Sequence, residues 1–150
     1  MDKVAKAWVD GSYNSKLDIY GSGSIIILPN GKELTILKSN SNNLSKYRNV
    51  TGEVLASLYT IYQCITLQMD KVVIYYDYKG IENWATGEWK ANNELTQTYV
   101  NAINKYKEHI NIAFVKVKGH SGDHYNEIAD SLAKKSIENY IKENGLWKKW

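Results

Sequence analysis

The order of apolar patterns along the chain limits the folds that are open to it. Three short strand-like runs come first, a helical pattern follows, and strand and helix patterns then alternate. Hairpin-connected strands followed by such an alternation predict a mixed sheet covered by helices on both faces. We therefore expect an α/β fold with a five-stranded mixed sheet, three antiparallel strands being followed by two parallel ones. The expected strands are residues 4–10, 21–28, 32–39, 72–76 and 110–117.

The helical patterns each bury one stripe of side chains. In the first of them, apolar residues recur at intervals of three and four from Val54 to Ile65. Thr51 is a candidate N-cap of this helix, and Asn92 or Asn93 is a candidate N-cap of the third. The expected helices are residues 51–68, 79–85, 92–108 and 125–142, and we expect 143–150 to form a loosely ordered tail.

Size and composition favour one globular domain over residues 1–150. With 43% apolar residues, a chain of this length buries roughly 70% of its unfolded surface. The net charge of +3 suits a nucleic-acid partner without demanding one. The single Cys64 excludes an internal disulfide and favours a reducing, cytoplasmic location. Since no run approaches the ~20 apolar residues that span a bilayer, we expect no membrane association. We also expect a monomer.

Four acidic residues stand where a fold can bring them to one edge of the sheet. Asp10 and Asp77 each end an apolar, strand-like run, while Glu53 and Asp130 lie in helical patterns. Four clustered carboxylates repel one another unless cations lie between them, and hard oxygen ligands favour Mg²⁺ or Mn²⁺. Taken singly, Asp10 before Gly11 can instead start a turn, and Glu53 and Asp130 have the simpler interpretation of solvated helix charges. Without metal, such a cluster raises at least one carboxyl pKa, so we expect activity to favour neutral to alkaline pH.

The sequence around these carboxylates resembles a known family. The segments are DGSYN, RNVTGE, YYDYKGIENW, WKANNELTQTY and KGHSGDHYNEIAD. With them the chain resembles the catalytic domain of type 1 ribonuclease H, metal-dependent endonucleases that cut the RNA strand of RNA·DNA hybrids. It is most similar to bacterial and virus-like members that lack a basic protrusion. The resemblance extends from about Val4 to about Ile137, and it implies the ribonuclease H fold.

The resemblance also implies a role for each site residue. Asp10 would bridge two divalent ions, Mg²⁺ with Mn²⁺ able to substitute. Glu53 and Asp77 would complete the ion nearer the leaving oxygen, and Asp130 the ion that activates water. His120, in the glycine-flanked KGHSG loop, would assist proton transfer or product release, although an inert surface histidine is its simpler interpretation. The expected products carry a 5′-phosphate and a 3′-hydroxyl.

The resemblance also implies three kinds of contact with the hybrid. The 2′-hydroxyl distinguishes RNA from DNA, and family members contact it from the loop after the first strand and from just before the glutamate. Two polar side chains are candidates for gripping a phosphate of the DNA strand. Trp84, Trp89 and Lys90 form a smaller substitute for the missing protrusion, or else the two tryptophans pack between helix and sheet. The implied contact residues are Gly11, Ser12, Asn14 and Asn49 for the 2′-hydroxyls, Arg48 and Asn92 for phosphate, and Trp89 for the aromatic surface.

Two other functions remain open at this point. Junction resolvases and transposases use similar carboxylate clusters on the same fold, so fold alone does not separate them from hybrid cutters. A hybrid-binding module that has lost catalysis is the other alternative. The presence of DGS, RNVTGE and KGHSG together favours a hybrid-cutting enzyme.

Overall fold

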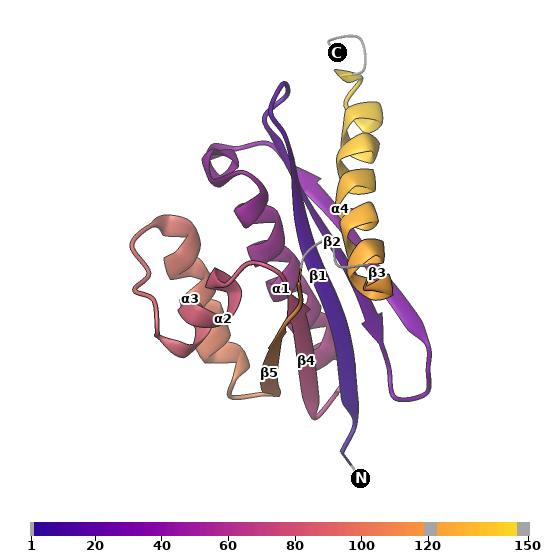
Figure 1. The fold of residues 1–150 in the computed structure, drawn as a ribbon, viewed down its shortest axis with the longest axis vertical. Coiled ribbons are helices and arrows are strands. Elements are labelled where there is room, and N and C mark those ends of the chain that lie inside the picture. The colour runs from indigo at the N-terminus through magenta and orange to yellow at the C-terminus, as the bar shows by residue number, and fades with distance from the viewer. Residues whose placement is uncertain (1, 119–122, 147–150) are drawn as a thin grey trace.

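The computed structural model describes residues 2–118 and 123–146. Its five strands and four α-helices follow the predicted order, with one additional 3₁₀ helix before α1 (Figure 1). The strands are β1 (Val4–Asn14), β2 (Ile19–Ile27), β3 (Glu33–Asn40), β4 (Lys71–Tyr76) and β5 (Asn111–Lys116). The helices are η1 (Asn43–Tyr47), α1 (Asn49–Thr66), α2 (Gly80–Thr86), α3 (Glu94–Tyr106) and α4 (His124–Glu143).

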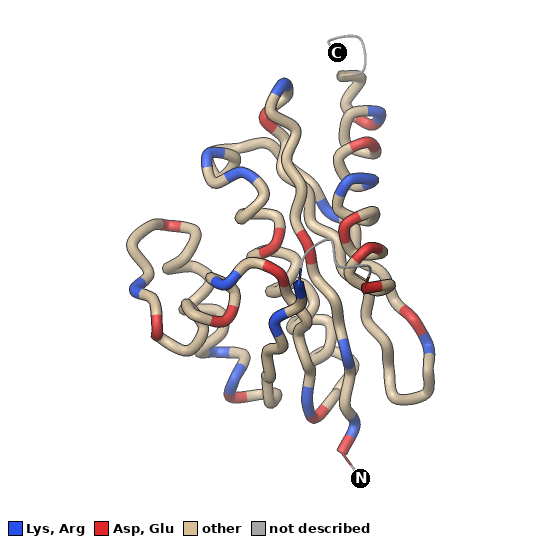
Figure 2. The backbone as a smooth tube through the Cα atoms, viewed as in Figure 1, with Lys and Arg blue, Asp and Glu red and all other residues tan. Residues whose placement is uncertain are grey.

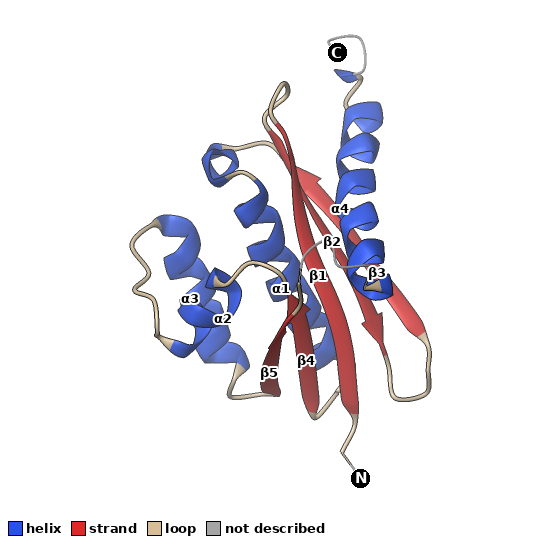
Figure 3. Cartoon of the chain, in the orientation of Figure 1, coloured by secondary structure: helices blue, strands red, loops and turns tan. Residues whose placement is uncertain are grey.

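The strands form one mixed sheet in the order β3-β2-β1-β4-β5. β1 to β3 pair antiparallel, whereas β4 pairs parallel with β1 and with β5, which confirms the predicted α/β class (Figure 3). The pairing of β1 with β4 runs as far as Trp8 opposite Tyr75. Asp10 lies two residues beyond that pair, at the carboxyl end of the parallel strands. This is the edge at which α/β proteins place ligand-binding groups.

Helices cover both faces of the sheet because β1 is apolar on both sides. Ala5, Ala7 and Val9 pack beneath α1, α2 and α3, while Trp8 points to the opposite face and packs with Ala129 of α4. Figure 1 shows α4 on one side of the sheet and α1 with α2 and α3 on the other. Among the described residues, none of the helices is both long and apolar enough to cross a membrane.

Two glycines allow helices to touch the sheet at backbone distance. A Cβ on Gly11 would lie 2.2 Å from the carbonyl oxygen of Asn49, in the first turn of α1. A Cβ on Gly23, which pairs with Asp10 in the β1–β2 register, would lie 2.3 Å from the carbonyl oxygen of Ala129. Glycine is required at both positions because any side chain would push a helix away. These contacts bring α1 and α4 close to Asp10.

Two local predictions are wrong. β1 continues to Asn14 instead of ending at residue 10, because residues 11–14 pair with the start of β2 and polar side chains do not interrupt a backbone ladder. Thr51 does not cap α1, which begins at Asn49; the Thr51 hydroxyl donates to the carbonyl oxygen of Leu44 at 2.7 Å. Of the two candidate caps of α3, Asn93 is confirmed, since its side chain accepts the amide of Thr96.

Candidate active site

Three of the four predicted carboxylates line one pocket of about 260 Å³. The pocket opens where β1 and β4 separate, between the first turn of α1 and the first half of α4. Figure 2 shows acidic positions of β1, α1, α4 and the segment after β4 gathered in this part of the molecule. A larger cavity of about 330 Å³ beside β3 contains none of them. The lining residues of the acidic pocket are Asp10, Gly11, Asn49, Asp77, Asn126, Glu127 and Asp130.

Glu53 is buried directly behind this pocket. Its side chain is 4% exposed, and one carboxylate oxygen accepts the amides of Asp77 at 3.0 Å and Tyr78 at 3.2 Å. Burial raises its pKa to about 8, the negative charge of Asp10 adds to the rise, and the two amide hydrogen bonds oppose it. Glu53 therefore ties α1 to the end of β4, and its interpretation as a solvated helix charge is wrong.

Asp10 lies at the centre of the acidic residues. Burial raises its pKa to about 7, and the charges of Asp130 and Asp77 act in the same direction. The amide of Gly11 donates to Asp10 Oδ1 at 2.8 Å and partly offsets this effect. An aspartate with this pKa is partly protonated at neutral pH, and a cation beside it restores the carboxylate.

Two lysines face the outer carboxylates. Lys134, one helical turn after Asp130, places its Nζ 2.9 Å from Asp130 Oδ2. The hydrogen bond to Asp130 raises the pKa of the Lys134 ammonium. At the end of β5, the Nζ of Lys116 lies 3.8 Å from Asp77 Oδ1. The acidic pocket is therefore bordered by positive charge on two sides.

The donor atoms of the pocket suit a hard divalent ion. Carboxylate oxygens are the ligands that Mg²⁺ and Mn²⁺ prefer. Asn126 adds a buried side-chain oxygen that accepts no hydrogen bond from any described residue. Within the described ranges, no three His, Cys, Asp or Glu side chains stand in a metal-holding arrangement. Oxygens of Glu53 and Asp130 are instead engaged by backbone amides and by Lys134, respectively.

The residues predicted to contact the RNA strand lie at or beside the pocket. Gly11 and Asn49 form part of its wall. Ser12 and Asn14 line an adjoining groove of about 300 Å³, whose other side includes Lys134. Asp130 of the pocket and Lys134 of the groove form an ion pair, so the two hollows are neighbours.

The other predicted contact residues are more dispersed. Arg48 is exposed, and its guanidinium carbon lies 5.7 Å from the centre of the Tyr13 ring. Asn92 is exposed in the connection before α3. His120 lies outside the described residues, so its predicted place beside the carboxylates is untested.

Trp89 belongs to an exposed aromatic group that begins next to Asp77. Its ring centre lies 6.2 Å from that of Tyr78 and 5.7 Å from that of Trp84. Trp84 packs partly against the core, whereas Trp89 is 37% exposed. The interpretation of both tryptophans as packing residues therefore holds for Trp84 only. Residues 87–93, which join α2 to α3, contain no helix, as expected for a chain without the protrusion.

Sequence reasoning missed three residues of the site. Asn126 and Glu127 line the acidic pocket, and Lys134 pairs with one of its carboxylates. The signal was present, since Asn126, Asp130 and Lys134 are spaced four apart and so share one helix face.

Comparisons with known proteins agree with this fold. RNase H1 from the halophilic archaeon Halobacterium salinarum NRC-1 superposes with a TM-score of 0.75 at 16% identity, covering 91% of this chain and 98% of that one. A compost-derived RNase H1, solved in complex with an RNA/DNA hybrid, superposes with a TM-score of 0.68 at 16% identity, covering 89% of this chain and 99% of that one. These likenesses show that the chain has the fold of these RNase H1 structures.

Sequence comparison identifies the family. The RNase H family model matches residues 2–138. The Ribonuclease H of Bartonella tribocorum is 30% identical, with 95% of this chain and 94% of the relative covered. The chain therefore belongs to the RNase H family and is an enzyme of the nuclease class.

Proposed function

We propose that the chain is an endonuclease that hydrolyses the RNA strand of RNA·DNA hybrids by two-metal-ion catalysis, leaving a 5′-phosphate and a 3′-hydroxyl. The observation that carries the proposal is the convergence of Asp10, Asp77 and Asp130 on one pocket, with Glu53 buried behind it. The compost-derived relative, whose structure contains an RNA/DNA hybrid, supports the choice of substrate.

The four carboxylates would hold two Mg²⁺ ions, for which Mn²⁺ substitutes. Asp10 is the proposed bridging ligand because it lies between Asp77 and Asp130 and interacts electrostatically with both. Glu53 and Asp77 would complete one ion and Asp130 the other. When bound, such ions activate a water molecule and stabilise the negative charge on the departing 3′ oxygen.

Several groups of the chain prepare the pocket for this reaction. The amide of Gly11 fixes the orientation of the Asp10 carboxylate through Oδ1. Asn126 lies in the wall of the pocket, four residues before Asp130 and on the same face of α4. His120 is the proposed group for proton transfer or product release.

The hybrid would lie across the pocket and the adjoining groove. Gly11, Ser12, Asn14 and Asn49 border this path, where backbone and amide groups are suited to contact 2′-hydroxyls. Phosphates of the DNA strand would meet Arg48 and Asn92, and the exposed ring of Trp89 would pack against a sugar. We further propose that residues 1–150 form one catalytic domain, which acts as a cytoplasmic monomer without membrane contact.

Cleavage of end-labelled substrates tests the proposal. The substrates are an RNA·DNA hybrid, RNA duplex, DNA duplex, branched DNA and single-stranded RNA, each with Mg²⁺, Mn²⁺ or EDTA. We expect metal-dependent cutting confined to the RNA strand of the hybrid and lost in Asp10→Asn. Cutting of branched or duplex DNA would assign the chain to the resolvase or transposase class. Tight hybrid binding without cutting would identify an inactive module.

A further inference from the structure

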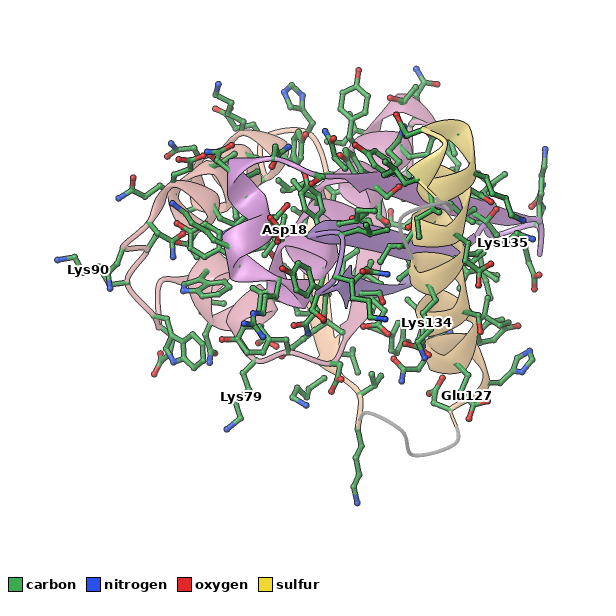
Figure 4. The ribbon with its side chains drawn as sticks, turned by 90° about the horizontal axis from the view of Figure 1, so that it is seen from above. Asp18, Lys79, Lys90, Glu127, Lys134 and Lys135 are labelled. Atoms are coloured by element: carbon green, nitrogen blue, oxygen red, sulfur yellow. The ribbon has the colours of Figure 1, made fainter. Side chains whose placement is uncertain are left out.

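Lys134 occupies a position that no catalytic role in the proposed reaction explains. Its ammonium contacts Asp130 at 2.9 Å, and its side chain also borders the groove beside Ser12 and Asn14. Figure 4 shows Lys134 and Lys135 on different sides of α4, and Lys135 borders a separate hollow with His124 and Glu127. These neighbouring lysines therefore differ in one respect that matters for the site, since only Lys134 of the two forms an ion pair within the described ranges.

We propose that Lys134 is a built-in counter-cation of the metal-free site, which pairs with Asp130 and must release it before a divalent ion binds there. The inference rests on the proposed function, because it concerns the ion that Asp130 would hold. Lys134 is thus a positioning residue that sets how readily the site accepts its ion.

The charges around the pocket explain why such a cation is useful. Asp10, Asp77 and Asp130 line one small space, and their mutual repulsion opposes folding when no cation is present. The positive charge of Lys134 acts on Asp10 as well as on Asp130. It therefore reduces the repulsion at two of the three carboxylates while the pocket contains no ion.

The strength of the pair is suited to a reversible role. The side chain of Lys134 is 63% exposed and that of Asp130 30% exposed, so water and salt screen their attraction. An exposed pair at this helical spacing changes an equilibrium constant by only about twofold. A divalent ion can displace such a partner, whereas a fully buried ammonium would block the site. The Asp77–Lys116 pair, at 3.8 Å, is longer and gives less competition.

Removal of the Lys134 charge should therefore strengthen ion binding. Loss of the competing pair, together with loss of repulsion between the ammonium and a divalent ion, should tighten Mn²⁺ binding by about three- to tenfold in Lys134→Met. Lys134→Arg retains the charge and should bind Mn²⁺ within about twofold of the wild type. Lys135→Met is the matched control, because it removes the same charge from the same helix without touching Asp130.

Calorimetric titration of the chain of residues 1–150 with Mn²⁺, in the absence of nucleic acid, tests the inference. Tighter binding by Lys134→Met but not by Lys135→Met supports it. Equal Mn²⁺ affinity of the wild type and Lys134→Met would overturn it while leaving the proposed function intact. If the wild type itself binds no Mn²⁺ at millimolar concentration, the two-ion proposal fails, and this inference fails with it.

Amine labelling provides a second measurement that does not depend on a variant. Brief acetylation followed by peptide mass spectrometry reports how available each ammonium is. Mn²⁺ should increase labelling of Lys134 severalfold and leave Lys135 unchanged, because only Lys134 is released from a carboxylate. Unchanged labelling of Lys134 at saturating Mn²⁺ would show that the ion binds without displacing it and would overturn the inference.

Discussion

Asp10→Asn should do more than abolish cleavage: it should stabilise the metal-free protein at alkaline pH. In the folded chain the pKa of Asp10 rises from 3.8 to about 7 through burial and the nearby charges of Asp130 and Asp77. Between these two values the folded state holds a proton that the unfolded state has lost. The free energy of unfolding therefore falls as pH rises through this window, and the full cost is present above pH 7. Asparagine does not ionise, so Asp10→Asn avoids this loss of stability at high pH.

The magnitude follows from the pKa difference. A difference of about 3 between the folded and unfolded chains corresponds to about 4 kcal/mol. Because the pocket is open to water and Asp10 is only partly buried, we expect about half of this, or about 2 kcal/mol, at pH 8. For a chain of this length that is roughly 6 °C in melting temperature. Removing the Asp10 charge also lowers the pKa of Glu53, and this further increases the stability of Asp10→Asn at alkaline pH.

Urea unfolding in EDTA, followed by circular dichroism at pH 4.5 and pH 8, measures this effect. The stability of Asp10→Asn relative to the wild type should increase between the two pH values, while the dependence on urea stays the same. Asp70→Asn is the control, because Asp70 is exposed at the other end of β4. A stability difference between Asp10→Asn and the wild type that is equal at both pH values would refute the reasoning. Excess Mg²⁺ at pH 8 should stabilise the wild type more than Asp10→Asn.

Three further substitutions test other parts of the structure. Gly11→Ala should lower the free energy of unfolding by about 3 kcal/mol, because its Cβ would lie 2.2 Å from a backbone oxygen of α1. Chemical denaturation measures this loss, and the control Ser12→Ala should lose less than about 0.5 kcal/mol. An equally small loss in Gly11→Ala would contradict the prediction. Glu53→Gln should lower kcat by about 100-fold or more while the protein stays folded, since a proposed carboxylate ligand of the metal ions is lost. Single-turnover cleavage checks the rate, and near-normal kcat would exclude Glu53 from the site. Arg48→Ala should weaken hybrid binding and reduce the slope of log affinity against log salt by about 0.9; fluorescence anisotropy at several salt concentrations measures the slope, and an unchanged slope would exclude a phosphate contact.

Much of the fold could be predicted because its signals are local. The apolar stripe from Val54 to Ile65 specifies α1, and a short buried run specifies β4. The errors arose where tertiary contacts decide the outcome. β1 extends to Asn14 only because β2 pairs with it. The Thr51 hydroxyl does not cap α1 because it donates to the carbonyl oxygen of Leu44 instead. The local sequence pattern indicates neither the pairing with β2 nor the hydrogen bond to Leu44.

The candidate site was predictable in type and less so in its environment. The family resemblance supplied Asp10 and its acidic partners, but the burial of Glu53 depends on its hydrogen bonds to residues 24 and 25 positions away. Lys134 was overlooked because a lysine on a helix is ordinarily a solvated charge. Its significance depends on Asp130 facing other carboxylates, which follows from the docking of α4 against the sheet.

The backbone contact between Gly23 and α4 also bears on when the enzyme becomes active during synthesis. α4 is the last helix that the structure describes, so Asp130 is made after the other three proposed carboxylate ligands. Until α4 docks against β2, the acidic cluster lacks one member and the pocket lacks one wall. Because a domain generally folds as a unit, a nascent or truncated chain without α4 should remain inert towards cellular RNA. Nuclease activity would begin only when the last helix has docked on the sheet.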